Sequence, residues 1–99
     1  MSIYSYKKYM SEIEQKASAL KDSRVKTCDQ YVQQVTDLGG ALSAFDAWNG
    51  MAKFYYATDL DAKMIIAART TYLNGLNSVK YHCKDCSTPT INGLRPRRR

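Results

Sequence analysis

The sequence predicts an all-α protein: a small bundle of three to five amphipathic helices with a flexible basic C-terminal tail. Apolar side chains recur at alternating spacings of three and four residues, which places them on one face of a helix. This periodicity stops at Ser87, where proline, Asn-Gly and arginine follow. A chain of 99 residues has the size of one domain. We therefore assign residues 1–86 to the helical domain and residues 87–99 to the tail.

The most regular helix is expected at the N-terminus, with Ser2 as its N-cap. Its apolar stripe is regular enough to pair with a second copy of the chain. The stripe consists of Ile3, Tyr6, Met10, Ile13, Ala17 and Leu20.

Two further helices are expected between residues 25 and 55. The first has an apolar repeat from Cys28 to Leu38, and the pair Gly39-Gly40 is expected to end it, because glycine adopts the left-handed C-cap conformation without strain. The second has its repeat from Leu42 to Tyr55 and contains Asn49-Gly50, a dipeptide that can kink or end a helix.

A fourth helix is expected to begin at Thr58 or Asp59, since both side chains can cap free backbone N–H groups. Its apolar stripe would be Ile65, Ala68, Tyr72, Leu76, Val79 and Cys83. The dipeptide Asn74-Gly75 is also a hairpin signal, so residues 70–82 have a β-hairpin as an alternative. Alternation about that turn leaves neither face consistently apolar, which favours the helix.

The cysteines offer a metal-site hypothesis. The segment from His82 contains Cys83 and Cys86 at the spacing of half a structural zinc site, and Cys28 could add a ligand. Four alternating helices would place Cys28 and Cys83 at opposite ends, so we predict no metal and no cofactor. A zinc-stabilised module stays the second alternative. An odd number of cysteines without a secretory signal or membrane span predicts reduced thiols and a cytoplasmic protein.

No catalytic constellation is evident. The sequence has one histidine and lacks the phosphate-binding loop, the dinucleotide fingerprint and the metalloprotease motif. We therefore predict that the protein is not an enzyme and has no catalytic residues.

Positive charge is concentrated in the tail. The net charge is +6, and the tail arginines supply four positive charges without a nearby acid. Together with lysines on the first helix, they suggest contact with nucleic acid as an alternative function. The candidate residues are Lys7, Lys8, Arg95, Arg97, Arg98 and Arg99.

The eight tyrosines are the most unusual feature of the composition. Exposed tyrosine supplies rigid contact area with a polar tip, as is typical of protein interfaces. We predict Tyr4, Tyr6, Tyr55 and Tyr56 as partner-binding residues. The predicted function is that of a small inhibitor, accessory or assembly protein. It would bind another protein or itself, as a homo-oligomer, and would not bind a membrane.

Overall fold

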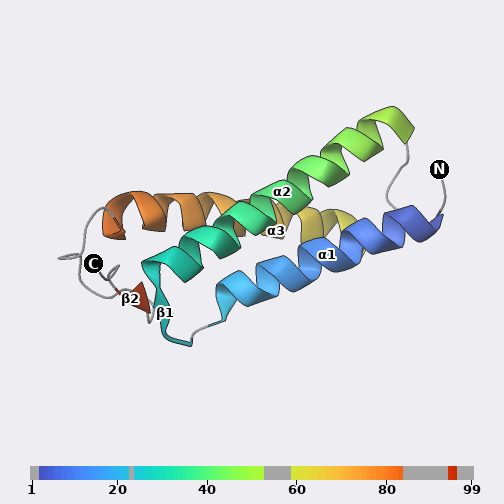
Figure 1. Ribbon diagram of the computed structural model, residues 1–99. Coiled ribbons are helices and arrows are strands. Elements are labelled where there is room, and N and C mark those ends of the chain that lie inside the picture. The colour runs from blue at the N-terminus through green and yellow to red at the C-terminus, as the bar shows by residue number, and fades with distance from the viewer. Residues whose placement is uncertain (1–2, 23, 53–58, 84–93, 96–99) are drawn as a thin grey trace.

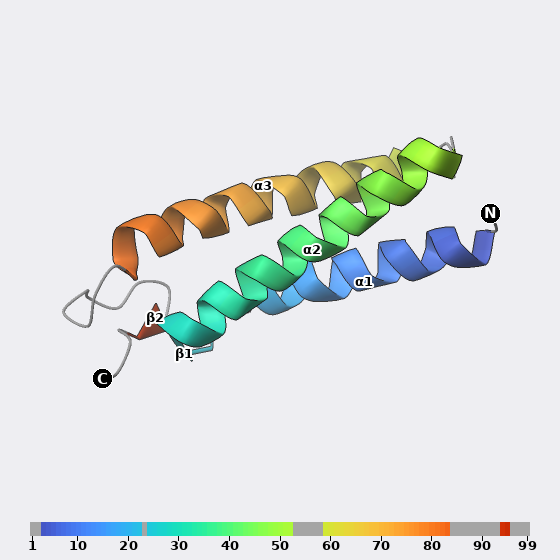
Figure 2. The same cartoon turned by 45° about the horizontal axis from the view of Figure 1, so that its top comes forward.

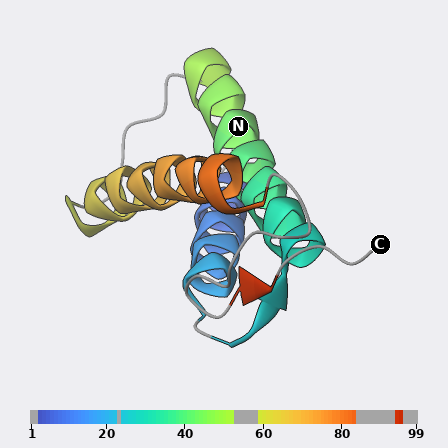
Figure 3. The same ribbon diagram turned by 90° about the vertical axis from the view of Figure 1, so that its left-hand side faces the viewer.

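The computed structural model describes residues 3–22, 24–52, 59–83 and 94–95 and confirms an all-α bundle. Within these ranges there are three helices: α1 (Ile3–Lys21), α2 (Cys28–Ala52) and α3 (Asp59–His82). They run along the length of the molecule, with α2 antiparallel to both α1 and α3 (Figures 1 and 2). Two short segments, β1 (Lys26–Thr27) and β2 (Leu94–Arg95), pair in parallel at the end where α1 finishes and α2 begins (Figure 3).

The apolar stripe of α1 is buried inside its own bundle. From Tyr6 to Leu20, its members are at most 8% exposed and pack against α2 and α3. The prediction that this stripe pairs with a second copy is therefore wrong, because the stripe already has its partners within the chain. The core cluster consists of Tyr6, Met10, Ile13, Ala17, Leu20, Val35, Leu38, Ala41, Leu42, Phe45, Trp48, Ile65 and Ala68.

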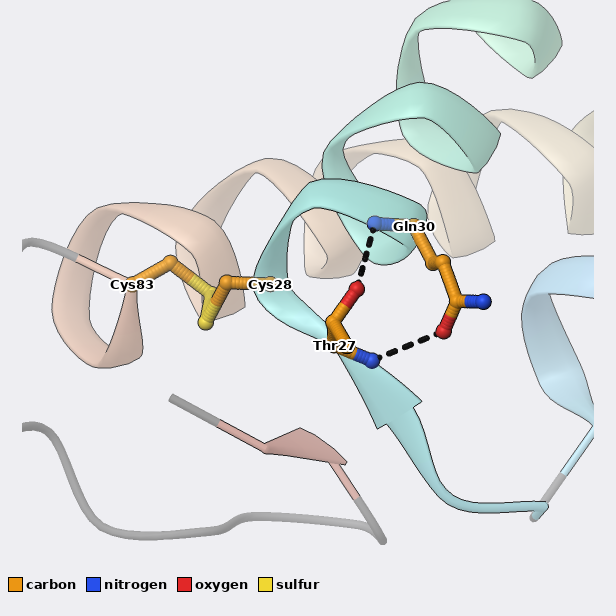
Figure 4. Close-up of a disulfide and its surroundings, with 4 residues drawn as sticks. All are labelled: Thr27, Cys28, Gln30 and Cys83. Carbon is orange, nitrogen blue, oxygen red and sulfur yellow. Dashed lines mark hydrogen bonds between the residues drawn. A yellow bond between two sulfur atoms is a disulfide. The ribbon is translucent and has the colours of Figure 1, made fainter. Parts of the chain in front are cut away.

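Helix α2 begins at a capping box. The backbone N–H of Gln30 donates to Thr27 Oγ1 at 3.1 Å, and the N–H of Thr27 donates to Gln30 Oε1 at 2.9 Å (Figure 4). Two backbone donors that the first turn leaves without helical partners are thus satisfied. Sequence reasoning did not find this cap.

The expected break at Gly39-Gly40 is absent, so the predicted second and third helices are one continuous helix. Gly39 serves a different purpose. A Cβ atom there would lie 2.6 Å from Cε1 of Tyr72, so glycine allows the α3 tyrosine to approach the α2 backbone. Asn49-Gly50 also lies within α2 and does not interrupt it.

The last predicted helix is confirmed, and residues 70–82 are helical rather than a hairpin. For one residue of its predicted stripe, Leu76, the prediction that the side chain is buried is wrong. Leu76 is 42% exposed, and the buried position beside it is Gly75. A Cβ atom on Gly75 would lie 2.8 Å from Cγ2 of Val35 and 3.2 Å from Cδ2 of Leu20. The helices therefore approach too closely at this point for a larger side chain to face the core.

An aromatic cluster fills the core where α1 meets the second half of α2. Tyr9 and Trp48 have ring centroids 5.3 Å apart, and Tyr6 packs edge-on against Phe45 at 6.5 Å. Edge-on and tilted arrangements are the favourable geometries for aromatic pairs. The Tyr6 hydroxyl donates to Asp61 Oδ2 at 2.7 Å and so links α1 to the first turn of α3.

Lys26 closes the other end of α1. It is only 8% exposed, and its Nζ donates to the carbonyl oxygens of Ala19 at 2.7 Å and Leu20 at 3.2 Å. A cation at these carbonyls stabilises a helix C-terminus. Burial lowers the pKa of Lys26 below the ordinary lysine value.

In the predicted flexible tail, Leu94 and Arg95 form β2, whereas residues 87–93 and 96–99 lie outside the described residues.

Candidate interaction surface on the third helix

Helix α3 carries a second apolar stripe that the bundle does not cover. Three large aliphatic side chains on it are well exposed: Ile66 at 62%, Leu73 at 58% and Leu76 at 42%. The full stripe has successive spacings of four, three, four, three and four residues, so its members share one helix face. The stripe consists of Ala62, Ile66, Arg69, Leu73, Leu76 and Lys80.

The contacts of α3 with its neighbours fix which face is left outside. Near its start, Asp61 accepts the Tyr6 hydrogen bond from α1. In its second half, Tyr72 lies against Gly39 of α2. Between them, Arg69 Nη2 bonds Asp46 Oδ1 of α2 at 2.8 Å. These contacts hold the Ile65–Ala68–Tyr72 face inward. The second stripe therefore lies at the solvent-facing border of α3 with α2.

The charges along α3 change sign from its start, where Asp59 and Asp61 lie in the first turn, to its end. The sequence from Ala62 to Cys83 contains no aspartate or glutamate. Lys63 and Lys80 are both exposed, and the Arg69 guanidinium is already paired with Asp46. Lys63 lies one helical turn after Asp59, a spacing at which opposite charges on a helix attract each other, so the uncompensated positive charge of the stripe lies toward its end, at Lys80.

The predicted partner-binding tyrosines do not form one surface. Tyr6 is 2% exposed and hydrogen-bonded to Asp61, so its prediction as a contact residue is wrong. A buried tyrosine ring can belong to the core while its hydroxyl is hydrogen-bonded to a half-buried carboxylate, as here with Asp61. Tyr4 is 76% exposed near the start of α1. Tyr55 and Tyr56 lie outside the described residues.

The predicted basic residues are not brought together. Lys7 and Lys8 are exposed near the start of α1. Arg95 belongs to β2, which lies at the opposite end of the molecule (Figures 1 and 2). Arg97, Arg98 and Arg99 lie outside the described residues. Lys7, Lys8 and Arg95 therefore do not form one continuous surface along which a phosphate backbone could run.

Two of the cysteines form a disulfide instead of remaining as thiols. Cys28 at the start of α2 is bonded to Cys83 just after α3, with their Cα atoms 5.6 Å apart (Figure 4). The expectation of reduced thiols is wrong for these two cysteines, since their sulfurs are bonded to each other. The expected placement at opposite ends is wrong because residues 28–52 form one continuous helix where two were expected, so α2 and α3 run in opposite directions. Both sulfurs are thus unavailable as zinc ligands. Cys86 and the His82 side chain lie outside the described residues, among which no cluster of metal-ligating side chains occurs.

A cavity of about 410 Å³ lies beside Lys26, between the end of α1 and the second half of α3. Its lining includes Asp22, Tyr31 and Ser78. The backbone N–H of Arg24, helped by the Arg24 guanidinium at 2.7 Å, lowers the pKa of the Asp22 carboxyl. Lys26 is committed to two carbonyl groups and stacks over the Tyr31 ring at 5.7 Å. These contacts close the end of a helix, and we assign them a structural role.

Sequence reasoning missed the exposed stripe because each helix was assigned one apolar face. The signal was present: from Ala62 to Lys80, a second heptad-like repeat runs beside the one that is buried.

The helices described by the structure include none with the length and apolar character needed to cross a membrane. Comparison with known proteins identifies no relative: no family model, no characterised protein and no solved structure matches this chain.

Proposed function

We propose that the protein is a non-enzymatic binding protein and that it contacts another protein through the exposed stripe of α3. The observation that carries this proposal is the exposure of Ile66, Leu73 and Leu76 along one side of a helix whose other side is buried. Apolar side chains aligned in this way lose contact with water when a second helix covers them, and this burial drives association.

A protein that binds a partner without catalysing a reaction is consistent with the roles of Lys26 and of the disulfide. The buried Lys26 caps a helix, and the Cys28–Cys83 pair is oxidised, so each of these reactive groups has a structural use. The protein would act as an inhibitor, accessory or assembly factor by occupying or bridging a partner's surface.

The disulfide also bears on location. Disulfides persist in oxidising compartments and are rare in the reducing cytosol. The Cys28–Cys83 bond therefore favours an oxidising compartment over the cytoplasm that the sequence alone suggests.

The proposal is tested by purifying the tagged protein from an extract of its native cells and identifying what accompanies it by native mass spectrometry. Leu73→Glu places a charge in the middle of the stripe, whereas Leu60→Glu changes an α3 leucine that is 75% exposed and off the stripe. We expect a partner to accompany the wild type and Leu60→Glu and to be lost with Leu73→Glu. A partner retained by all three proteins would refute the role of the stripe.

Nucleic acid would be detected in the same experiment. Binding through Lys7, Lys8 and the tail arginines predicts co-purified nucleic acid that is released by salt and is insensitive to Leu73→Glu. That outcome would replace protein contact with the alternative function.

A further inference from the structure

We propose that the cavity beside Lys26 binds a small molecule that carries an oxyanion, either a carboxylate or a phosphate. The cavity has a volume of about 410 Å³, which lies within the usual range for small-molecule sites. Its walls come from the end of α1, from β1 and the start of α2, and from the second half of α3. The inference goes beyond the proposed function and does not depend on it, because the described residues that line the cavity include none from the α3 stripe.

A buried cation indicates the charge of the ligand. Lys26 is 8% exposed, and it takes part in no ion pair within the described part of the chain. Buried charges in proteins are normally paired, because removing an ion from water is costly. The carbonyl oxygens of Ala19 and Leu20 accept two of the three ammonium protons, but they carry no net charge. The third N–H has no acceptor among the described residues, and an oxyanion in the cavity would supply one.

The other charges around the cavity leave this cation uncompensated. Asp22 lines the cavity, but its two oxygens accept from the Arg24 backbone N–H at 3.0 Å and from the Arg24 guanidinium at 2.7 Å. The electric fields that act on the buried ammonium come from these two groups, one of each sign. Lys21 adds a second cation to the lining and has no ion-pair partner among the described residues. Outside the lining, Asp29 near the start of α2 and Lys80 near the end of α3 contribute one charge of each sign.

The hydrogen-bonding groups on the cavity wall also favour an acceptor as the ligand. Four wall side chains can donate a hydrogen bond and make none within the described part of the structure: Lys21, Tyr31, Asn74 and Ser78. The only carboxylate among the described lining residues already accepts from Arg24. An ionised carboxylate or phosphate offers several oxygens that accept hydrogen bonds, so it matches this excess of donors.

The rest of the wall is apolar and leaves room for a small hydrocarbon group next to the oxyanion. It consists of the Leu20 side chain, the Tyr31 ring and the backbone at Gly75. Small-molecule sites commonly combine such apolar surface with a few polar groups that fix the orientation of the ligand. A carboxylate attached to an aromatic ring is therefore a suitable probe.

The test titrates benzoate, its uncharged analogue benzamide and inorganic phosphate into the full-length, disulfide-bonded protein, and follows backbone amides by NMR. Benzoate should shift the signals of Leu20, Tyr31 and Gly75 until the site is saturated. Benzamide should bind at least about tenfold more weakly, because it lacks the charge that strengthens hydrogen bonds from the ammonium. Phosphate distinguishes the two sources of the oxyanion: tighter binding than benzoate assigns the site to phosphates, and weaker binding assigns it to carboxylates.

Three variants and two controls locate the binding. Ser78→Leu fills the cavity and should abolish the benzoate shifts, whereas Asn77→Leu changes an exposed residue outside the lining and should retain them. Lys21→Gln should weaken benzoate about two- to fivefold, as expected for an exposed charge, and Lys63→Gln on the first half of α3 should not. Lys26→Met should remove the preference for benzoate over benzamide. Circular dichroism verifies that each variant is folded, and the first two variants decide the outcome if Lys26→Met is not.

The results that overturn the proposal are distinct. Equal affinity for benzoate and benzamide would refute the oxyanion as the recognised group. Shifts that persist in Ser78→Leu would place the ligand elsewhere and refute the cavity as its site. If neither benzoate nor phosphate gave saturable shifts, the cavity would not be a site for small oxyanions. None of these results bears on the co-purification experiment with Leu73→Glu, so the two proposals can fail separately.

Discussion

Replacing Gly75 by alanine should destabilise the protein, although the same change usually stabilises a helix. Gly75 lies within α3 and is buried where that helix crosses both of the others. The added Cβ would lie 2.8 Å from Cγ2 of Val35 and 3.2 Å from Cδ2 of Leu20. Real Cβ atoms essentially never approach another heavy atom as closely as the first of these distances, so a neighbour must move.

Two opposing terms set the magnitude. Alanine favours the helical conformation over glycine by about 1 kcal/mol. Inserting a methyl group into a packed core typically costs about 1–3 kcal/mol. Val35 is 3% exposed and β-branched, so it has few alternative rotamers, and Leu20 is 5% exposed. We therefore expect the steric cost to exceed the helical gain and the free energy of unfolding to fall by about 1 kcal/mol.

Gly40→Ala supplies the matched control. Gly40 is also inside a helix, but it is exposed, and a Cβ there would meet no atom within 4 Å. Only the helical gain applies, so we expect the free energy of unfolding to rise by about 0.5–1 kcal/mol. The two alanine variants should thus move in opposite directions from the wild type.

Thermal and urea unfolding, followed by circular dichroism, measure the difference. A change of 1 kcal/mol moves the midpoint of a domain this small by about 4–8 °C. The midpoint should fall by about that amount for Gly75→Ala and rise by somewhat less for Gly40→Ala. If both variants were stabilised equally, α3 would not approach α1 and α2 closely at Gly75, and the rotation of α3 that exposes the stripe would have to be revised.

Three further predictions concern the contacts that hold the helices together. Tyr6→Phe removes the hydrogen bond to Asp61 and should lower the free energy of unfolding by about 1–2 kcal/mol, measured by urea titration. Reducing the Cys28–Cys83 bond should lower it by about 4 kcal/mol, since the bond joins residues 55 apart; alkylation before and after reduction should differ by two cysteines. Burial lowers the pKa of Lys26 below 10.5, so the unfolded chain retains this proton more strongly between the two pKa values. The stability of the wild type should therefore rise with pH through that window relative to Lys26→Met, with unfolding compared at about pH 9–11.

Periodicity was sufficient to predict the helices but not the positions where they end. The repeats of α1 and α3 fall where sequence reasoning places them. The glycine pair in α2 was misread because glycine serves two purposes in helical proteins. It can take the left-handed conformation that ends a helix, or it can let another helix approach. Only the position of Tyr72 against Gly39 distinguishes them, and that contact joins residues far apart in the sequence.

This single error also concealed the disulfide. With a break at Gly39, α2 counts as two helices, and the start of the first lies far from the end of the last. Without the break, α2 and α3 are antiparallel neighbours, and Cys28 meets Cys83. The expected placement of these two cysteines at opposite ends depended on the number of helix reversals between them, whereas the expectation of free thiols rested on the odd number of cysteines and could not indicate which two of the three would meet.

The rotation of α3 connects the fold with the proposed surface. A helix packed against two others needs one apolar face, and α3 has that face in Ile65, Ala68 and Tyr72. A second aliphatic stripe is not required for this packing, and its exposure to water does not stabilise the fold. Turning α3 so that Leu76 took the buried position of the neighbouring Gly75 is blocked, because even a Cβ atom at that position would lie 2.8 Å from Cγ2 of Val35. The packing of three helices therefore accounts for the first stripe but not for the second, and it is this difference that motivates the proposed binding surface.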